Sequence, residues 1–375
     1  MAHDFQNPRT RKYSNLRIFI RNIELVLKKS FLFLFIIVNF FFHNNKKKSI
    51  DIESYNKKDN RFINYFFFSL KDEYNFSYDI SFSVLDFIKK IGIKNFLLHS
   101  IPNIFLKDQY KIKFCLNKKN LNVNELNFNT NYFGNINKDC LTLPYYVYPR
   151  LYNNNRYNKL NFFNKNEKKI KILFSGSTNN HVYGKFKWVD ENGVSLLNRI
   201  EIINFVIKNY ENQIFFLKSF DDLNNIDYLK TPIVLSINDN LVKKTKTNLT
   251  NSQHFEIISR SQFLLTAPGA DMPLCHHLIE GIKMKSIPIS NYTNLHKPTI
   301  PNDSCLHFTN YETLKNSIDN ALIMPETEIY SKQKKLEKFY SEVLSPSSFL
   351  ESFKKRTSNE ILACNDVESL DWLEK

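Results

Sequence analysis

The chain has 375 residues, enough for two domains of ordinary size, and its 42% hydrophobic and 24% charged residues exclude wholesale disorder. Its seven glycines form neither a GxGxxG nor a GxxxxGK[ST] phosphate loop, which excludes the dehydrogenase and P-loop nucleotide motifs. The five cysteines form no CxxC pair, so neither a zinc ribbon nor a disulfide framework is predicted, and a reduced, cytoplasmic setting is expected.

The net charge of +15 is concentrated at one end of the chain. Residues 1–50 hold ten Lys or Arg against Asp4 and Glu24, which is +8. The stretch from residue 357 to the end is acidic. We find no helix-turn-helix, RRM or OB signature, and the charge does not form a basic face along the predicted sheets. The sequence therefore predicts no nucleic-acid partner.

The basic N-terminal segment, 1–50, encloses an apolar run at 31–42. Twelve residues of helix rise about 18 Å, which is short of the roughly 30 Å of a hydrocarbon core. Three interpretations remain open: a helix lying on an anionic membrane surface, a short membrane anchor, or an apolar helix buried under the following domains. Peripheral attachment to the membrane is favoured.

A first α/β unit is predicted over 51–152. Prolines in 143–149 indicate an extended crossing segment at its end. The polar stretch 153–169, rich in Asn and Lys, is the predicted linker. The expected elements of this unit are strands at 62–68, 95–99 and 111–116 and a helix at 84–91.

A second unit, over 170–345, alternates strands with helices, which is typical of a parallel sheet covered on both faces. A C-terminal helix and acidic tail, 346–375, follow it. The predicted class is α/β, with two Rossmann-like domains facing across a cleft and a basic, apolar N-terminal extension. The expected strands are 170–174, 213–217, 233–237, 263–266, 287–290 and 306–308, and the expected helices are 197–209, 252–260, 274–284, 313–322, 328–343 and 348–355.

Two strand-to-helix junctions carry the residues expected to bind a ligand. The first is the Ser175-Gly176-Ser177 turn, and the second is the segment 267–271, which contains Gly269. Open parallel sheets bind ligands beyond the carboxyl ends of their strands, where helix N-termini favour anions. The helix after the second junction carries His277 and Glu280, three positions apart and on one face. This arrangement suits a phosphorylated ligand.

The stretch 257–269 and the following 280–289 resemble the exostosin-type glycosyltransferases. That family has a hydrophobic-x-x-Ser-x-Phe-x-Leu-x-Pro-x-Gly run, a helix with Glu, and a Gly-Cys-Ile-Pro-Val strand, and the match covers residues 140–345. The resemblance implies a GT-B fold and an inverting, metal-independent transfer of a sugar from a nucleoside-diphosphate sugar to a glycan or glycolipid acceptor, as in polysaccharide biosynthesis. The N-terminal domain would bind the acceptor and the C-terminal domain the donor.

The resemblance also assigns roles to residues. Arg199 and His277 would balance the charge of the leaving diphosphate, and Glu280 would accept hydrogen bonds from ribose or base. Removal of Arg199 is expected to leave the melting temperature nearly unchanged. No catalytic base is assigned, although His99 follows a predicted strand at a suitable position. The implied donor-binding residues are Gly176, Ser177, Arg199, Ser261, Gly269, His277 and Glu280.

Three alternatives were weighed against this function. A metal site could draw on His181, Asp271, His276 and His277, but adjacent helical residues point about 100° apart and no HxxxH pair is present. We therefore expect no metal and no cofactor. A catalytically degenerate GT-B scaffold or sugar-binding protein is the main alternative, and a nucleic-acid-binding protein is disfavoured.

Overall fold

We describe the protein from a computed structural model. The described residues are 49–51, 62–78, 100–102, 111–116, 125–134, 139–152, 156–161, 167–185, 187–190, 192–238, 247, 249–270, 272–364 and 369. The apolar N-terminal run, the helix expected at 84–91, the strand expected at 95–99 with His99, and Asp271 lie outside them. Among the helices that are described, none has the length and apolar character needed to cross a membrane.

The first sheet is entirely parallel. Its strands are β1 (Ser49–Asp51), β2 (Asn75–Tyr78), β3 (Ser100–Pro102), β4 (Lys111–Leu116), β5 (Glu125–Asn129), β6 (Leu141–Thr142) and β13 (Glu360–Leu362). They lie in the order β3-β2-β1-β4-β5-β13-β6. The order 3-2-1-4-5 is that of the Rossmann fold.

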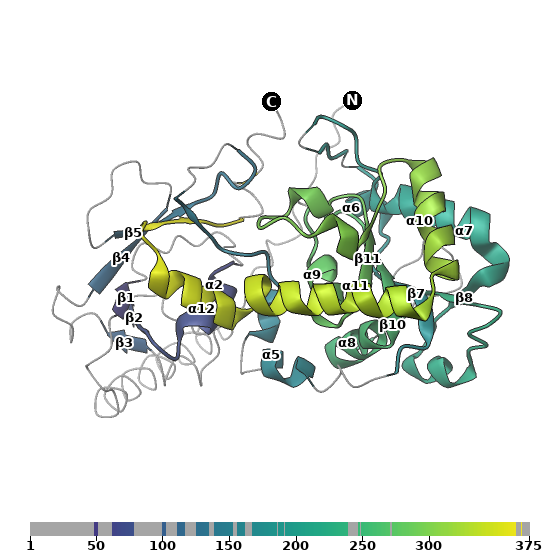
Figure 1. The fold of residues 1–375 in the computed structure, drawn as a ribbon, viewed down its shortest axis with the longest axis horizontal. Coiled ribbons are helices and arrows are strands. Elements are labelled where there is room, and N and C mark those ends of the chain that lie inside the picture. The colour runs from purple at the N-terminus through teal and green to yellow at the C-terminus, as the bar shows by residue number, and fades with distance from the viewer. Residues whose placement is uncertain are drawn as a thin grey trace, which may run out of the picture.

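The second sheet is also parallel throughout. Its strands are β7 (Ile170–Gly176), β8 (Ile214–Phe216), β9 (Ile233–Ile237), β10 (Ser261–Leu265), β11 (Ile287–Ser290) and β12 (Leu306–His307). They lie in the order β12-β11-β10-β7-β9-β8. The α/β class with two Rossmann-like units is therefore confirmed, and the two sheets lie at opposite ends of the molecule (Figure 1).

The helices predicted for the second unit are present, and local capping explains where they begin. Asn198, Thr250 and Asn310 each close a capping box at the start of a helix. The helices are α6 (Asn180–Tyr183), α7 (Arg199–Tyr210), α8 (Asn251–Ser259), α9 (His276–Lys283), α10 (Tyr311–Ile323) and α11 (Glu326–Phe339). The short α5 (Arg156–Lys159) falls within the predicted linker.

The strand predicted at 62–68 is wrong, because this segment is the helix α2 (Phe62–Leu70). Every residue of α2 is buried, so the run has no polar face that could reveal a helical period. Aromatic side chains enclose it on several sides: Phe66 packs edge-on against Phe128 of β5 and against Phe353. A continuous apolar run fits a buried helix as well as a buried strand.

The C-terminal part of the chain returns to the first unit. After α11, the π-helical turn Tyr340–Leu344 leads into α12 (Pro346–Lys355), which packs on α2. In Figure 1 these helices run from the second unit to the first, and β13 then enters the first sheet between β5 and β6. The hydroxyl of Tyr65 donates to the carbonyl of Leu344 at 3.0 Å. The sequence predicted an acidic tail here and no strand.

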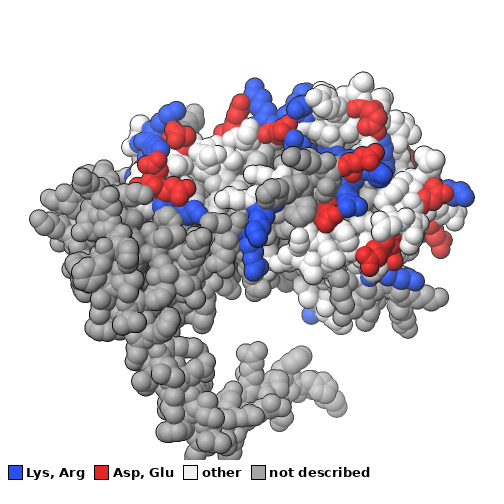
Figure 2. All heavy atoms as spheres, turned by 90° about the horizontal axis from the view of Figure 1, so that it is seen from below, with Lys and Arg blue, Asp and Glu red and all other residues white. Residues whose placement is uncertain are grey.

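Charged side chains of both signs are interspersed on the face shown in Figure 2. Charged residues of the described chain also form surface ion pairs, such as Lys354 with Glu73 of the first unit at 3.1 Å. Among the residues that this view describes, Lys and Arg do not gather into a continuous basic stripe.

A partly buried lysine, Lys168, contacts the amino-terminal end of β10 and two helix ends beside it. Lys168 donates through Nζ to the carbonyls of Ser259, Ser261 and Met284 at 2.9–3.0 Å. Ser259 ends α8, and Met284 directly follows α9, so these carbonyls belong to helix ends that lack partners within the helix. Lys168 therefore joins two helices to β10.

We expect Lys168→Ala to lower the free energy of unfolding by about 3 kcal/mol, because three buried carbonyls would lose their donor. Lys169→Ala is the matched control, since the Lys169 side chain is 57% exposed and pairs with Glu167 at the surface. The control should cost less than about 1 kcal/mol. Urea unfolding of both variants measures the difference, and equal losses would contradict the capping role of Lys168.

Candidate functional site

The candidate site lies beyond the carboxyl ends of β7 and β10. These two strands are neighbours in the sheet. The strands β8 and β9, which follow β7 in the chain, lie on one side of this pair, and β11 and β12, which follow β10, lie on the other side. Such a reversal is the topological switch point at which open α/β sheets bind ligands. A cavity of about 490 Å³ opens there, between the carboxyl end of β7 and the start of α9.

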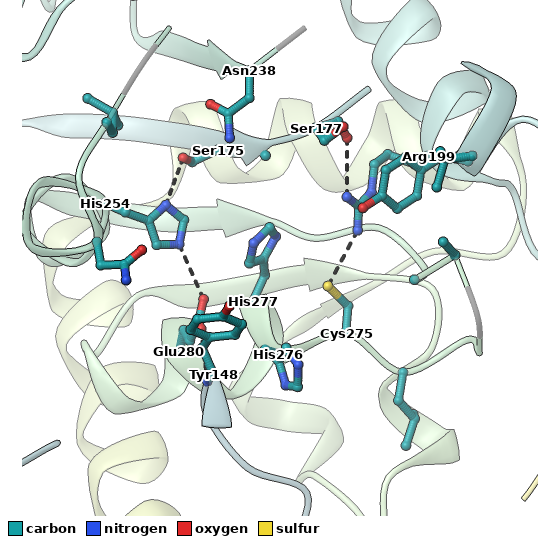
Figure 3. Close-up of a pocket in the computed structure, with 18 of the residues that line it drawn as sticks. Tyr148, Ser175, Ser177, Arg199, Asn238, His254, Cys275, His276, His277 and Glu280 are labelled. Atoms are coloured by element: carbon teal, nitrogen blue, oxygen red, sulfur yellow. Dashed lines mark hydrogen bonds and ion pairs between the residues drawn. The ribbon is translucent and has the colours of Figure 1, made fainter. Parts of the chain in front are cut away.

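Arg199, the first residue of α7, is 3% exposed and anchors one wall of this cavity. Its guanidinium donates to the carbonyls of Ser177 at 3.2 Å and Pro268 at 3.2 Å, and to the Sγ atom of Cys275 at 3.4 Å (Figure 3). The ring of Tyr183 stacks on it at 3.9 Å. Arg199 thus links the two strand-to-helix junctions, and these buried contacts argue against the expectation that its removal would leave the melting temperature nearly unchanged.

Cys275 and His277 lie close together at the start of α9, and each shifts the pKa of the other. Burial alone raises the pKa of the Cys275 thiol, but His277 and Arg199 outweigh it and lower this pKa to about 5. Burial lowers the pKa of His277, yet Cys275 and Glu280 outweigh it and raise the value above its usual range. The cavity wall at this point therefore places the Cys275 thiol beside the His277 imidazole and the Arg199 guanidinium, an arrangement that favours the thiolate.

His254, near the start of α8, bridges two junction residues. Its Nδ1 lies 3.0 Å from the hydroxyl of Ser175, and its Nε2 lies 3.3 Å from Oε2 of Glu280. The other carboxylate oxygen of Glu280 accepts the backbone N–H of Tyr148 at 3.2 Å. Figure 3 shows His277 standing between this network and the Arg199–Cys275 contact.

Glu280 is only 2% exposed, yet its contacts favour the ionised form of its carboxylate. Burial raises its pKa, but the His254 hydrogen bond and the charges of His277, His254 and His276 lower it to about 2. A buried carboxylate is stable only when it is paired and hydrogen-bonded, and both conditions hold here. The α9 helix therefore carries a fixed negative charge at the cavity floor.

The crossing segment between the two units supplies an aromatic wall. Tyr145 stacks on His276 with ring centroids 5.5 Å apart, and His276 Nδ1 donates to the carbonyl of Tyr146 at 3.2 Å. Tyr148 also lines the cavity. The site is thus completed by a segment that precedes the second sheet in the chain.

The two junctions need a glycine for different physical reasons. A Cβ on Gly176 would lie 2.9 Å from Cε1 of His277, so this glycine allows the imidazole to approach β7. A Cβ on Gly269 would meet the backbone carbonyls of Met272 and Leu274 at 2.6 and 2.8 Å. The Gly269 N–H donates to the carbonyl of Pro273, so it serves the turn and not a phosphate.

Six of the seven predicted donor-binding residues line one cavity: Gly176, Ser177, Arg199, Gly269, His277 and Glu280. Ser261 does not line it. Ser261 begins β10 at the opposite end of the strand, where its hydroxyl lies 2.9 Å from that of Ser286 and donates to the carbonyl of Ile258. Its position supports a core role and not a place in the site.

Sequence reasoning missed Ser175, His254, Cys275 and Tyr148 as parts of one network. The Ser175-Gly176-Ser177 turn was predicted to bind a ligand, but no role was predicted for the side chains of Ser175 or Cys275. His254 lies 26 positions before Glu280 and Tyr148 lies 132 positions before it, and no spacing rule connects such residues.

The sequence matches no family model and no curated protein sequence. Solved structures with a similar chain trace include an α1,3-fucosyltransferase, at 11% identity over 85% of this chain and 93% of that one, with a TM-score of 0.35. Another is WaaG, a glycosyltransferase involved in lipopolysaccharide biosynthesis, at 9% identity over 83% and 99%, with a TM-score of 0.36.

A third similar structure is that of OtsA, at 11% identity over 53% of this chain, with a TM-score of 0.33. The chain spans about half the length of OtsA, of which it covers 48%. At sequence identities this low, the similarity concerns the fold alone.

Proposed function

We propose that this protein is a glycosyltransferase of the GT-B type, which moves a sugar from a nucleoside-diphosphate sugar to a glycan or glycolipid acceptor in polysaccharide biosynthesis. The observation that carries the proposal is the convergence of six residues, chosen from the sequence, on one cavity at the switch point of the second sheet. The resemblance of residues 257–289 to exostosin-type enzymes points to the same chemistry. Peripheral attachment through the basic N-terminal segment would bring the enzyme to a lipid-linked acceptor.

The leaving diphosphate is the group that the positive wall of the cavity would stabilise. Negative charge grows on this group during transfer, and donors fixed in a site shielded from water stabilise it strongly. Arg199 and His277 would supply the cationic groups, and α9 begins beside them with the positive end of its helix dipole. The cavity thus matches the charge that develops on the donor side.

Glu280 would bind the nucleoside part of the donor. An ionised carboxylate has about four acceptor positions, and His254 and Tyr148 use two of them. The remaining lone pairs can accept ribose hydroxyls. The base that deprotonates the acceptor would come from the first unit, and transfer would invert the anomeric centre, as the exostosin-type resemblance implies.

A catalytically degenerate sugar-binding protein or scaffold of the same fold is the second candidate. One observation favours it: Arg199 already donates to the sulfur of Cys275 and to three backbone carbonyls. An incoming diphosphate would have to compete with these acceptors. A protein that binds nucleotide sugars without turning them over would agree with this arrangement.

A thermal-shift panel of UDP-, GDP-, ADP- and CMP-sugars, run in EDTA, tests the proposal. A ligand present at a hundred times its dissociation constant should stabilise the protein by about 2.7 kcal/mol. Release of free nucleotide on addition of acceptor then separates transfer from binding alone. Stabilisation without turnover would favour the sugar-binding alternative, and no shift with any nucleotide would refute a donor site.

A further inference from the structure

The network around His254 has a second property that nucleotide binding does not require. His254, His277 and Glu280 each direct one ligand atom into a common space, and these three atoms lie within 4.8 Å of one another. We propose that the three side chains form a binding site for a divalent transition-metal ion of the zinc type. This site departs from the expectation of a metal-free protein.

The three residues come from two elements that the fold holds in place. His254 belongs to α8, while His277 and Glu280 lie one turn apart on α9. The rings of His254 and His277 are 5.3 Å apart between centroids, and Nε2 of His254 is 3.3 Å from Oε2 of Glu280. An ion with ligand distances of about 2.0–2.2 Å needs only small side-chain rotations to sit among these atoms.

Two of the three ligands, His254 and Glu280, are held by a contact through an atom that the ion would not use. Without an ion, Nε2 of His254 can donate its proton to Glu280, and this proton must leave when an ion binds. The Nδ1 of His254 is 3.0 Å from the Ser175 hydroxyl, so an N–H at Nδ1 would then orient the ring with Nε2 toward the ion. Oε1 of Glu280 accepts the Tyr148 N–H, which leaves Oε2 for the ion. The His277 ring rests against Gly176, where a Cβ would approach within 2.9 Å.

Outer contacts of this kind are what orients the ligands of real metal sites. They distinguish this cluster from acidic groups that meet by chance on a surface, because Glu280 is buried and both histidines are partly buried.

The ligand types decide the class of metal. Imidazole suits Zn²⁺, Co²⁺ and related ions, whereas Mg²⁺ and Ca²⁺ prefer oxygen ligands. Two histidines and one glutamate also leave at least one coordination position of the ion open, as in zinc sites that bind water or substrate. All three residues line the donor cavity, so an ion held by them faces whatever occupies it (Figure 3).

The test uses the full chain, freed of metal with EDTA and then exchanged into chelator-free buffer. Equilibrium dialysis against Zn²⁺, with a chromophoric chelator as competitor, measures the stoichiometry and affinity. We expect one tightly held ion per chain, and no comparable binding of Mg²⁺ or Ca²⁺. Co²⁺ should give visible d–d absorption bands of a site with nitrogen and oxygen ligands.

Variants locate the ion. His254→Ala and Glu280→Gln should each weaken Zn²⁺ binding by more than about a hundredfold, and Ser175→Ala by about ten- to a hundredfold, because Ser175 orients a ligand without touching the ion. His181→Ala is the matched control, since His181 lies exposed on α6 and should leave the affinity unchanged. Circular dichroism checks that each variant is folded, and Ser175→Ala keeps the test decisive if the ligand variants unfold.

Failure to bind Zn²⁺, or equal binding by folded His254→Ala, would overturn the metal site. Strong thiolate-to-Co²⁺ charge-transfer bands that vanish in Cys275→Ser but persist in His254→Ala would also overturn it. Neither result bears on the proposed binding of a nucleotide sugar, because that proposal is tested in EDTA, where no metal is bound. Conversely, a protein that binds Zn²⁺ but no nucleotide would keep this site and lose the proposed function.

Discussion

Replacing Arg199 with alanine is expected to lower the free energy of unfolding by about 3–5 kcal/mol and to weaken binding of the nucleotide sugar at least tenfold. The stability loss follows from burial, because three backbone carbonyls and the Cys275 sulfur would lose their donor inside the protein. The binding loss follows from the missing positive charge and from the released Pro268 turn. Urea unfolding and calorimetric titration measure the two effects separately.

Arg260→Ala provides the matched control for this experiment. Arg260 lies in the same unit, but its side chain is 33% exposed and pairs with Glu256 four residues earlier. Its removal should cost less than about 1 kcal/mol and leave nucleotide binding unchanged. An Arg199→Ala variant that keeps its stability and loses only affinity would contradict the structural role assigned to the guanidinium. Full retention of affinity would remove Arg199 from the donor site.

Replacing Glu280 with alanine is expected to reduce nucleotide affinity by roughly ten- to a hundredfold, which corresponds to the loss of one charge-assisted hydrogen bond of about 1.5–3 kcal/mol. The change also leaves the imidazole of His254 and the N–H of Tyr148 without an acceptor. Glu280→Gln keeps the shape and one acceptor oxygen, so it should lose less. Titration in EDTA removes any contribution from a bound metal.

Glu256→Ala is the corresponding control, since this carboxylate lies on α8 in the surface pair with Arg260 and does not line the cavity. Its affinity should equal that of the unaltered protein. Unchanged affinity in both Glu280 variants would show that the carboxylate is a structural group, and the resemblance to exostosin-type enzymes would lose its best-matched residue.

The second unit could be predicted from the sequence almost element by element. Its strands are short apolar runs and its helices begin at capping residues such as Asn198 and Thr250, so each element carries a local signal. The two junctions were predicted for the same reason, because a strand end, a glycine and a helix start are neighbours in the chain. Gly176, Gly269, His277 and Glu280 were found in this way.

The helix α2 in the first unit, and the return of the chain to that unit through β13, could be recognised only in the tertiary structure. The run at 62–68 is apolar on every side, so only its packing between β5 and α12 decides that it is a helix. The strand β13 has three residues and gains its partners from β5 and β6. A strand this short is stabilised by the neighbouring strands, so its own residues carry too weak a signal to predict it.

The sequence by itself determined the α/β class, the second sheet and the glycine junctions, because these depend on residues close together in the chain. Only the tertiary structure decided how the site works. It joined His254 to Ser175 and Glu280, brought Tyr148 onto the same carboxylate, and turned Arg199 inward to bind carbonyls. Hydrogen bonds and charges act over a few ångströms of space whatever the separation in sequence, so the partners of a buried polar group are fixed only when the chain has folded.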